Sequence, residues 1–166
     1  MSVSPSPATL AYWTHQRPAP VSDVEIASLE GRLGLKAPPG YVEFMRTYGA
    51  VEFDTVDTPC CFSYIYEGSG QIEQRASAVS FIMSPQRSLR YYEGTQSDAK
   101  LHLPRHLVPF GMDYGQGELL IEFGQPTERI YYWDFDTHDW ESGVTRIGFV
   151  VNDLVEFINT LKPYED

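Results

Sequence analysis

The chain has 166 residues, of which 42% are hydrophobic and 21% charged, a length and composition typical of a folded protein with a buried core. Its net charge of −11 argues against binding to nucleic acid or to an anionic membrane, because both would repel it. No apolar run approaches the roughly 20 residues of a membrane-spanning helix, and we do not expect residues 1–7 to be a secretion signal, because they have no basic cluster and no apolar core follows them. We therefore expect one cytoplasmic domain over residues 1–166, with residues 1–20 as a loosely attached lead-in.

The N-terminal part predicts helices separated by prolines. A short helix is expected at residues 8–15, before a proline-rich break. Ser22 and Glu25 then have the spacing of a capping box, and Gly34 is placed to end the helix that follows. After a proline-rich corner at residues 35–40, the aromatic residues of 41–48 share one face of a second helix, so we assign them to the core.

The next segments read as strands followed by a helix. Residues 51–53 and 60–67 are rich in strand formers, and residues 68–70 suit a turn. The adjacent Cys60 and Cys61 cannot form an unstrained disulfide with each other, and we expect them to face opposite sides of their strand. Residues 71–83 fit a strand or a helix, with alternation supporting a strand at Ile72. Ser84 and Pro85 suit the start of a helix reaching residue 92, with a polar loop over residues 93–100.

Residues 107–140 contain the pattern around which we expect the fold to be organised. Residues 118–123 and 129–134 are rich in aromatic and branched side chains and flank a turn, which predicts a β-hairpin at the middle of the sheet. Gly111, Gly115 and Gly117 would let the preceding loop adopt backbone angles that other residues avoid.

The C-terminal part completes the predicted architecture. Residues 136–143 suit an acidic loop or short strand, and a closing helix begins near Asn152 and is stopped by Pro163. Helices, then strands, then a last helix, without regular βαβ alternation, indicate an α+β fold. We expect a mostly antiparallel central sheet of about six strands with flanking N-terminal and C-terminal helices.

The sequence contains no complete catalytic or metal-binding pattern. His102 and His106 are four residues apart, but Pro104 lies between them and no third ligand is evident. Residues 134–139 resemble the start of a calcium loop, yet Asp139 stands where glycine is needed and Thr145 where glutamate is needed. We interpret this run as a solvated acidic turn, and predict a non-enzymatic protein without cofactor or metal.

Three segments of the chain carry the residues of one family pattern, in the right order. The residues of the helix–proline–helix segment are Ile26, Leu29, Leu33, Gly34, Leu35, Pro38, Tyr41, Phe44, Met45, Tyr48 and Gly49. The residues of the middle segment are Val108, Pro109, Phe110, Gly111, Asp113, Gly117, Glu118, Ile130, Tyr131, Tyr132, Trp133 and Asp134. Together with residues 149–161, which correspond to a closing amphipathic helix, these segments resemble the SMI1/KNR4 family of the SUKH superfamily. Glu118 stands where aspartate is frequent, and residues 71–100 match no segment of the family.

The resemblance implies an α+β domain and, for many bacterial members, an immunity protein that neutralises a cognate toxin, often a nuclease. Fungal relatives act in cell-wall signalling. An acidic chain suits a basic toxin, and aromatic residues among acids suit a protein interface. The predicted partner-binding residues are Asp113, Tyr114, Glu118, Asp134, Asp136, Asp139, Trp140 and Glu141. The first alternative is a general interaction or regulatory module without a toxin partner, and the second is an enzyme or small-ligand protein that uses the glycine-rich loop and the acids of residues 134–139. The sequence leaves the oligomeric state open.

Overall fold

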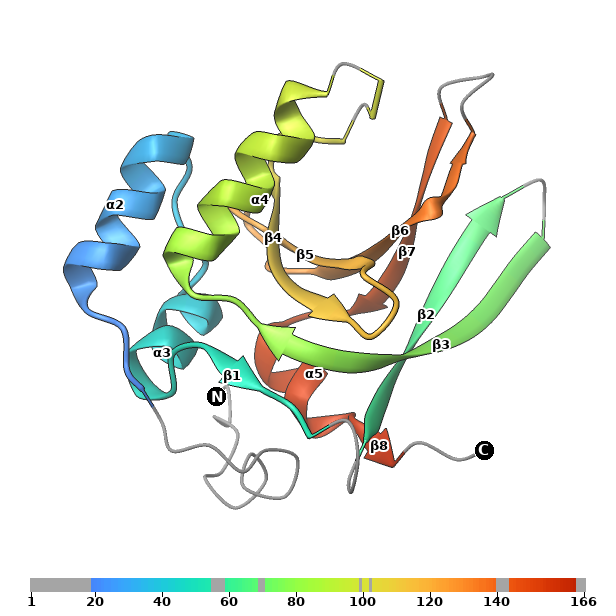
Figure 1. Ribbon diagram of the computed structural model, residues 1–166, viewed down its shortest axis with the longest axis horizontal. Coiled ribbons are helices and arrows are strands. Elements are labelled where there is room, and N and C mark those ends of the chain that lie inside the picture. Colours follow the sequence, from blue (N-terminus) through green and yellow to red (C-terminus); the bar gives the residue numbers. More distant parts are fainter. Residues whose placement is uncertain are drawn as a thin grey trace.

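Antiparallel strands and four helices make up the part of the chain that the structure, a computed structural model, describes: residues 19–54, 59–68, 71–98, 100–101, 103–139 and 144–163 (Figure 1). The helices are α2 (Asp23–Leu33), α3 (Pro39–Thr47), α4 (Pro85–Ser97) and α5 (Leu154–Asn159). The strands are β1 (Val51–Glu52), β2 (Cys60–Gly68), β3 (Gln71–Ile82), β4 (Leu107–Asp113), β5 (Glu118–Glu122), β6 (Ile130–Asp139), β7 (Val144–Val151) and β8 (Lys162–Pro163). No helix in this part of the chain is long and apolar enough to cross a membrane.

Six of the strands close into a ring. The sheet order is β1-β3-β4-β5-β6-β7-β2-β8, and β2 also pairs with β3, so the path from β3 through β4, β5, β6, β7 and β2 returns to its start. All of these strand pairings are antiparallel. The α+β class and the antiparallel sheet are confirmed, and the expected hairpin, β5–β6, lies in the middle of the order. The sequence predicted a central sheet of about six strands; the described sheet has eight, and six of them close into a ring that pairs residues far apart in the chain.

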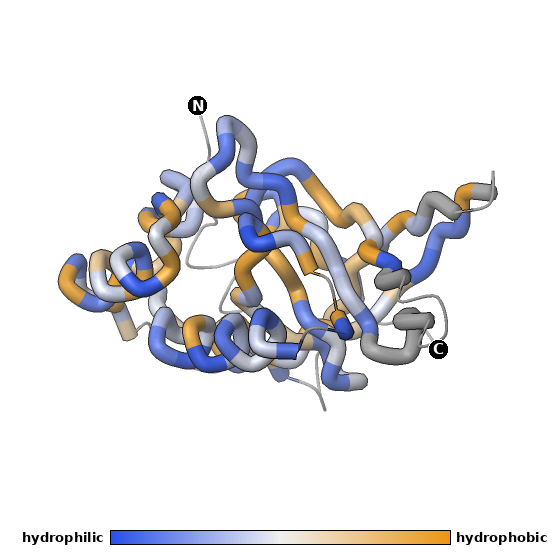
Figure 2. Tube along the Cα trace, turned by 90° about the horizontal axis from the view of Figure 1, so that it is seen from above, coloured by the Kyte–Doolittle hydropathy of each residue, from blue (hydrophilic) through white to orange (hydrophobic). Residues whose placement is uncertain are grey.

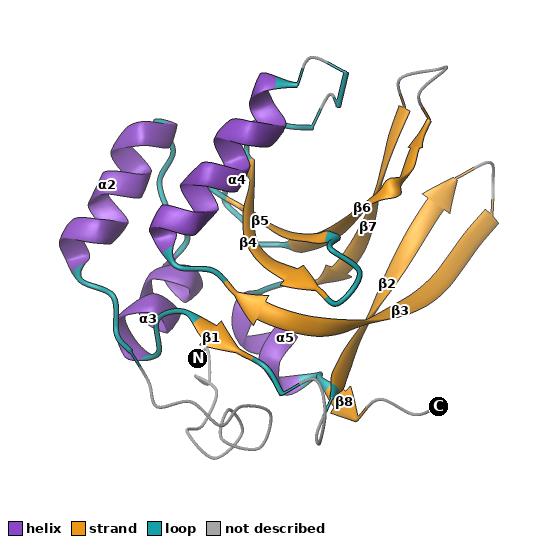
Figure 3. Cartoon of the chain, viewed as in Figure 1, coloured by secondary structure: helices purple, strands orange, loops and turns teal. Residues whose placement is uncertain are grey.

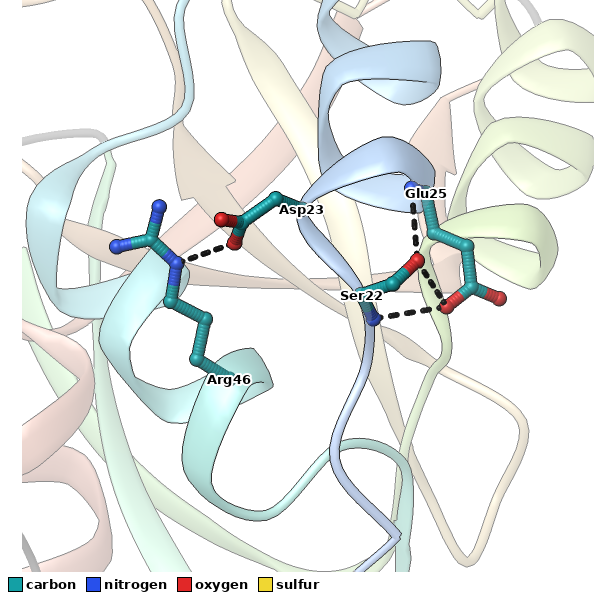
Figure 4. A network of polar contacts seen from close by, with 4 residues as sticks. All are labelled: Ser22, Asp23, Glu25 and Arg46. Carbon is teal, nitrogen blue, oxygen red and sulfur yellow. Dashed lines mark hydrogen bonds and ion pairs between the residues drawn. The ribbon is translucent and has the colours of Figure 1, made fainter.

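Helices α2, α3 and α4 lie on the left in Figure 3, α5 lies near the centre below the strands, and the β2–β3 and β6–β7 hairpins extend on the right. The capping box at the start of α2 is confirmed, because Ser22 Oγ accepts from the Glu25 N–H and the Glu25 carboxylate accepts from the Ser22 N–H (Figure 4). Gly34 ends α2 at φ 66°, a left-handed conformation that favours glycine. Arg46 of α3 donates to Asp23 of α2 at 2.6 Å, which adds a surface ion pair between the two helices (Figure 4).

Several local predictions differ from the structure. Residues 71–82 form one strand, and α4 continues to Ser97 instead of ending at residue 92. The closing helix is capped by Asp153, whose carboxylate accepts from the Glu156 N–H, and not by Asn152. The predicted helix at residues 8–15 lies outside the described residues, as do residues 69–70 of the turn and 140–143 of the acidic segment.

The strands of the ring have an inner and an outer face with different neighbours. On β5, Leu119 and Ile121 face inward and join the main core, which includes apolar residues of α2, α3 and α5. Leu120 faces outward and joins a smaller cluster with Trp133, which Leu101 from the connection between α4 and β4 helps to cover. Hydrophobic and hydrophilic residues accordingly alternate along the helices and strands (Figure 2). Whether a side chain near the candidate site is buried, and in which cluster, therefore depends on the face of the strand from which it points.

Candidate partner-binding surface

Asp113, at the end of β4, is a buried carboxylate with three donors around it. It is 5% exposed and faces inward, where its Oδ2 accepts from Tyr132 Oη at 2.6 Å and from Ser77 Oγ at 2.5 Å. Its Oδ1 accepts from the Gly117 N–H at 2.6 Å. Burial, and then the Asp113 carboxylate, raise the pKa of Tyr132, so the phenol remains a donor. Asp113 therefore joins β3, β6 and the β4–β5 turn.

The turn that Asp113 holds presents an aromatic side chain to solvent. Tyr114 is 68% exposed, while its backbone N–H donates to the Ala78 carbonyl on β3 at 2.9 Å. Gln116 follows with φ 69°, a left-handed conformation that is uncommon for a residue other than glycine. A backbone fixed at both ends and an exposed aromatic side chain form a rigid projection.

The prediction that Gly111, Gly115 and Gly117 adopt backbone angles that other residues avoid is wrong. Among the described glycines, positive φ occurs at Gly34, Gly49 and Gly124, and not at the three glycines of the β4–β5 region. Gly117 is instead needed for close approach, because a Cβ there would lie 2.3 Å from Tyr132 Oη. The turn can thus pack directly on the phenol that binds Asp113.

Glu118 is also buried, but on the opposite face of the sheet from Asp113. It lies opposite Met112 on β4 and Trp133 on β6, and Trp133 belongs to the outer cluster. Glu118 is 5% exposed and its Oε2 has no hydrogen-bond partner. Burial raises its pKa to about 7, because an apolar site disfavours the charged form.

The structure therefore does not gather the eight predicted residues into one exposed patch. Asp113 and Glu118 are buried on opposite faces, Tyr114 is exposed, and Asp134 is half-buried on β6. The other four are Asp136 and Asp139, which belong to β6 and whose side chains are not described, and Trp140 and Glu141, which lie outside the described residues. Partner binding by these residues stays a prediction, and Tyr114 is the member with a described, exposed side chain.

Several acidic residues outside the predicted site accept hydrogen bonds from backbone N–H groups and so hold loops in place. Glu128 Oε2 accepts from the Gly40 N–H at 2.9 Å, which attaches the β5–β6 connection to the start of α3. Glu30 similarly accepts from the Ala37 N–H, and Glu122 from the Arg129 N–H. Gly40 and Glu128 are 88 residues apart in the chain, so no local sequence pattern predicts their hydrogen bond. Part of the negative charge is consequently used to hold loops.

The described residues offer little support for metal or thiol chemistry. They contain no group of three or more His, Cys, Asp or Glu side chains placed to hold a metal ion. Cys60 is buried and Cys61 is half-buried, on opposite sides of β2 as predicted, and both are free thiols. Burial raises the pKa of Cys60 to about 12, which keeps it protonated and unreactive. An open hollow of about 770 Å³ between α2 and α3 is lined in part by the Asp23–Arg46 ion pair.

The fold and this turn define an α+β protein built on a closed antiparallel ring, with a rigid aromatic projection beside it. The model of the SMI1 / KNR4 family (SUKH-1) matches residues 20–160. The chain belongs to this family, and the resemblance noted in its sequence is confirmed. A comparison with curated proteins finds no match. The match begins where the lead-in was expected to end, but the division of the chain at residue 20 stays a prediction.

Proposed function

We propose that this chain is a non-enzymatic immunity protein that binds and neutralises a cognate bacterial toxin. Membership of the SMI1/KNR4 family supports a role of this kind. The observation that carries the proposal is the Tyr114 turn, which presents a 68% exposed aromatic side chain on a backbone that hydrogen bonds hold in place. We place its action in the cytoplasm, where a toxin would reach its target.

The Tyr114 turn has the physical properties of an interface anchor. Aromatic side chains dominate binding energy at many protein interfaces, because they bury a large area with few rotatable bonds. A turn that is already fixed loses little conformational entropy when a partner binds. Here the Asp113 hydrogen bonds to Gly117 and Tyr132 hold the backbone before binding. Little of the binding free energy that Tyr114 gains by burial is therefore lost to ordering the turn.

The net charge indicates the partner's chemistry. A chain with a charge of −11 attracts a basic protein and repels an acidic one, which raises the association rate with the former. A nuclease toxin must attract phosphate, so it has a basic surface. The proposed partner is accordingly a basic toxin, with a nuclease as the favoured chemistry.

Co-expression tests the proposal. The product of the gene beside this one would be expressed alone, with the native chain, and with Tyr114→Ala. We expect the neighbour to stop growth, the native chain to restore it through a stable complex, and Tyr114→Ala to weaken that complex by about 2 kcal/mol or more, as for an interface hot spot. Isothermal titration calorimetry with the purified proteins measures the loss. Gln116→Ala, at a neighbouring exposed position, controls for changes to the turn itself.

Two results would contradict the proposal. A neighbour that still kills in the presence of the native chain would remove the immunity role for that pair. Partners that bind weakly, in several kinds and without any rescue, would favour a general interaction or regulatory module.

A further inference from the structure

Strand β3 has one edge that is paired throughout and another that is left open. Along Gln71 to Ala78 it pairs residue by residue with β2. On its other side β4 pairs with it only at Val79, Phe81 and Ile82, and the last hydrogen bond there runs from the Tyr114 N–H to the Ala78 carbonyl. No described strand pairs with this second edge between Gln71 and Ser77. Figure 1 shows the β2–β3 hairpin extending away from the helices.

The open backbone groups can be assigned by alternation. In an antiparallel strand the N–H and C=O of one residue point to the same neighbour, and those of the next residue point to the other side. Since the Ala78 carbonyl points toward Tyr114, the same side is faced by the N–H and C=O groups of Ile72, Gln74 and Ala76. Each of these residues thus has a donor and an acceptor on the open edge.

Such an edge is unusual because exposed strand edges promote unwanted pairing. The two strands at the ends of the sheet order, β1 and β8, have two residues each, which limits what can pair with them. The open part of β3 is longer and carries Ile72, whose side chain is 74% exposed. It also begins beside Tyr114, the proposed anchor. A long open edge that carries an exposed apolar residue, next to a rigid aromatic turn, points to a use in binding.

We propose that the partner toxin binds by adding an extended segment as a strand along the Gln71–Ser77 edge of β3, in line with β4 beyond Tyr114. This inference rests on the proposed function and names the structure that the partner must present. Main-chain hydrogen bonds supply affinity in such strand addition, and side-chain contacts supply specificity.

The side chains of β3 indicate the sequence of that segment. Ile72, Gln74 and Ala76 share the outer face, and Glu73 and Arg75 share the inner face, where they form an ion pair at 2.8 Å. Arg75 also lies over the Tyr66 ring at 5.5 Å. An added strand alternates in the same way, so we expect an apolar residue beside Ile72 and charged residues beside the Glu73–Arg75 pair.

Proline substitution tests the backbone contact directly. Gln74→Pro removes an N–H that faces the open edge, and proline is tolerated at such edge positions because the ladder to β2 does not use that N–H. Gln74→Ala is the matched control, since it removes the same side chain and keeps the N–H. We expect Gln74→Pro to weaken binding to the purified toxin at least tenfold in calorimetry, and Gln74→Ala to bind within about threefold of the native chain. Thermal unfolding of both variants checks that the ring is intact.

Amide hydrogen exchange gives a second measurement if Gln74→Pro unfolds. In the free chain the amides of Ile72, Gln74 and Ala76 should exchange faster than those of Glu73 and Arg75, and they should become protected in the complex. Unchanged exchange in the complex, or full rescue by a folded Gln74→Pro variant, would overturn strand addition and leave the immunity role standing. A native chain that already dimerises through this edge would also overturn it. Failure of the native chain to rescue would remove the proposed function, and this inference with it.

Discussion

Asp113 and Glu118, two carboxylates on either side of the β4–β5 turn, are equally buried but differ in their hydrogen bonds. Asp113 has three donors within 2.6 Å of its oxygens, which replace the water it loses on burial. Glu118 is equally buried, but its Oε2 has no partner and its pKa rises to about 7 through burial. Asp113 therefore stabilises the turn, whereas ionised Glu118 lowers the stability of the fold.

A pH series on Glu118→Gln tests this account. The carboxyl's pKa is 4.5 in its ordinary state and about 7 in the folded protein, so between these values the folded state binds more protons than the unfolded state. The free energy of unfolding of the native chain should then fall as pH rises through this window. At about pH 8 Glu118→Gln should be more stable by up to about 3 kcal/mol, and near pH 4 the two proteins should be equal.

The measurement is urea unfolding at several pH values. Glu93→Gln, which removes the exposed acid of the Arg32 ion pair on α4, controls for the loss of one surface negative charge. A stability gain for Glu118→Gln that does not depend on pH would show that the carboxyl is not titrating between its two pKa values.

At the scale of the element, the close approach of the β4–β5 turn to β6 limits which residues the turn can contain. A Cβ on Gly117 would lie 2.3 Å from Tyr132 Oη, whereas one on Gly115 would make ordinary contact with Asp113 Oδ2 at 3.6 Å. We expect Gly117→Ala to displace the Tyr132 phenol from Asp113 and to cost about 1–3 kcal/mol, as for overpacking of a core. Gly115→Ala is the matched control and should change stability by less than about 1 kcal/mol.

Thermal unfolding measures both variants, and binding to the toxin reports the turn. If the Asp113 network fixes the position of Tyr114, Gly117→Ala should also weaken binding, whereas Gly115→Ala should not. Equal stability of the two variants would show that the turn yields to the added methyl group without strain.

Elements with local signals could be predicted from the sequence, and elements formed by distant partners could not. The capping box of Ser22 and Glu25 and the left-handed Gly34 are properties of a few neighbouring residues. The pairing that closes the ring joins β2 to β7 at Ile65 and Phe149, which lie far apart in the chain. The same distinction explains the candidate site. Tyr114 lies in the glycine-rich loop that the sequence marks, and its exposure fits that position, whereas burial of Glu118 follows from the register across β4, β5 and β6, which no local pattern fixes.

At the scale of the whole molecule, charge and anchor should act on different steps of binding. The charge of −11 acts over distance and steers the encounter, while Tyr114 acts only after contact. Raising salt from about 0.1 M to about 1 M shortens the screening length from about 10 Å to about 3 Å. We therefore expect the association rate constant with a basic toxin to fall about tenfold or more over this range.

Stopped-flow mixing of the chain with inactivated toxin measures this rate constant. Tyr114→Ala should leave the association rate and its salt dependence nearly unchanged and raise the dissociation rate, because short-range contacts mainly determine how long a complex lasts. An association rate that is independent of salt would contradict a basic partner. If Tyr114→Ala slowed association instead, the turn would act in the encounter itself, and its role as a buried anchor would be wrong.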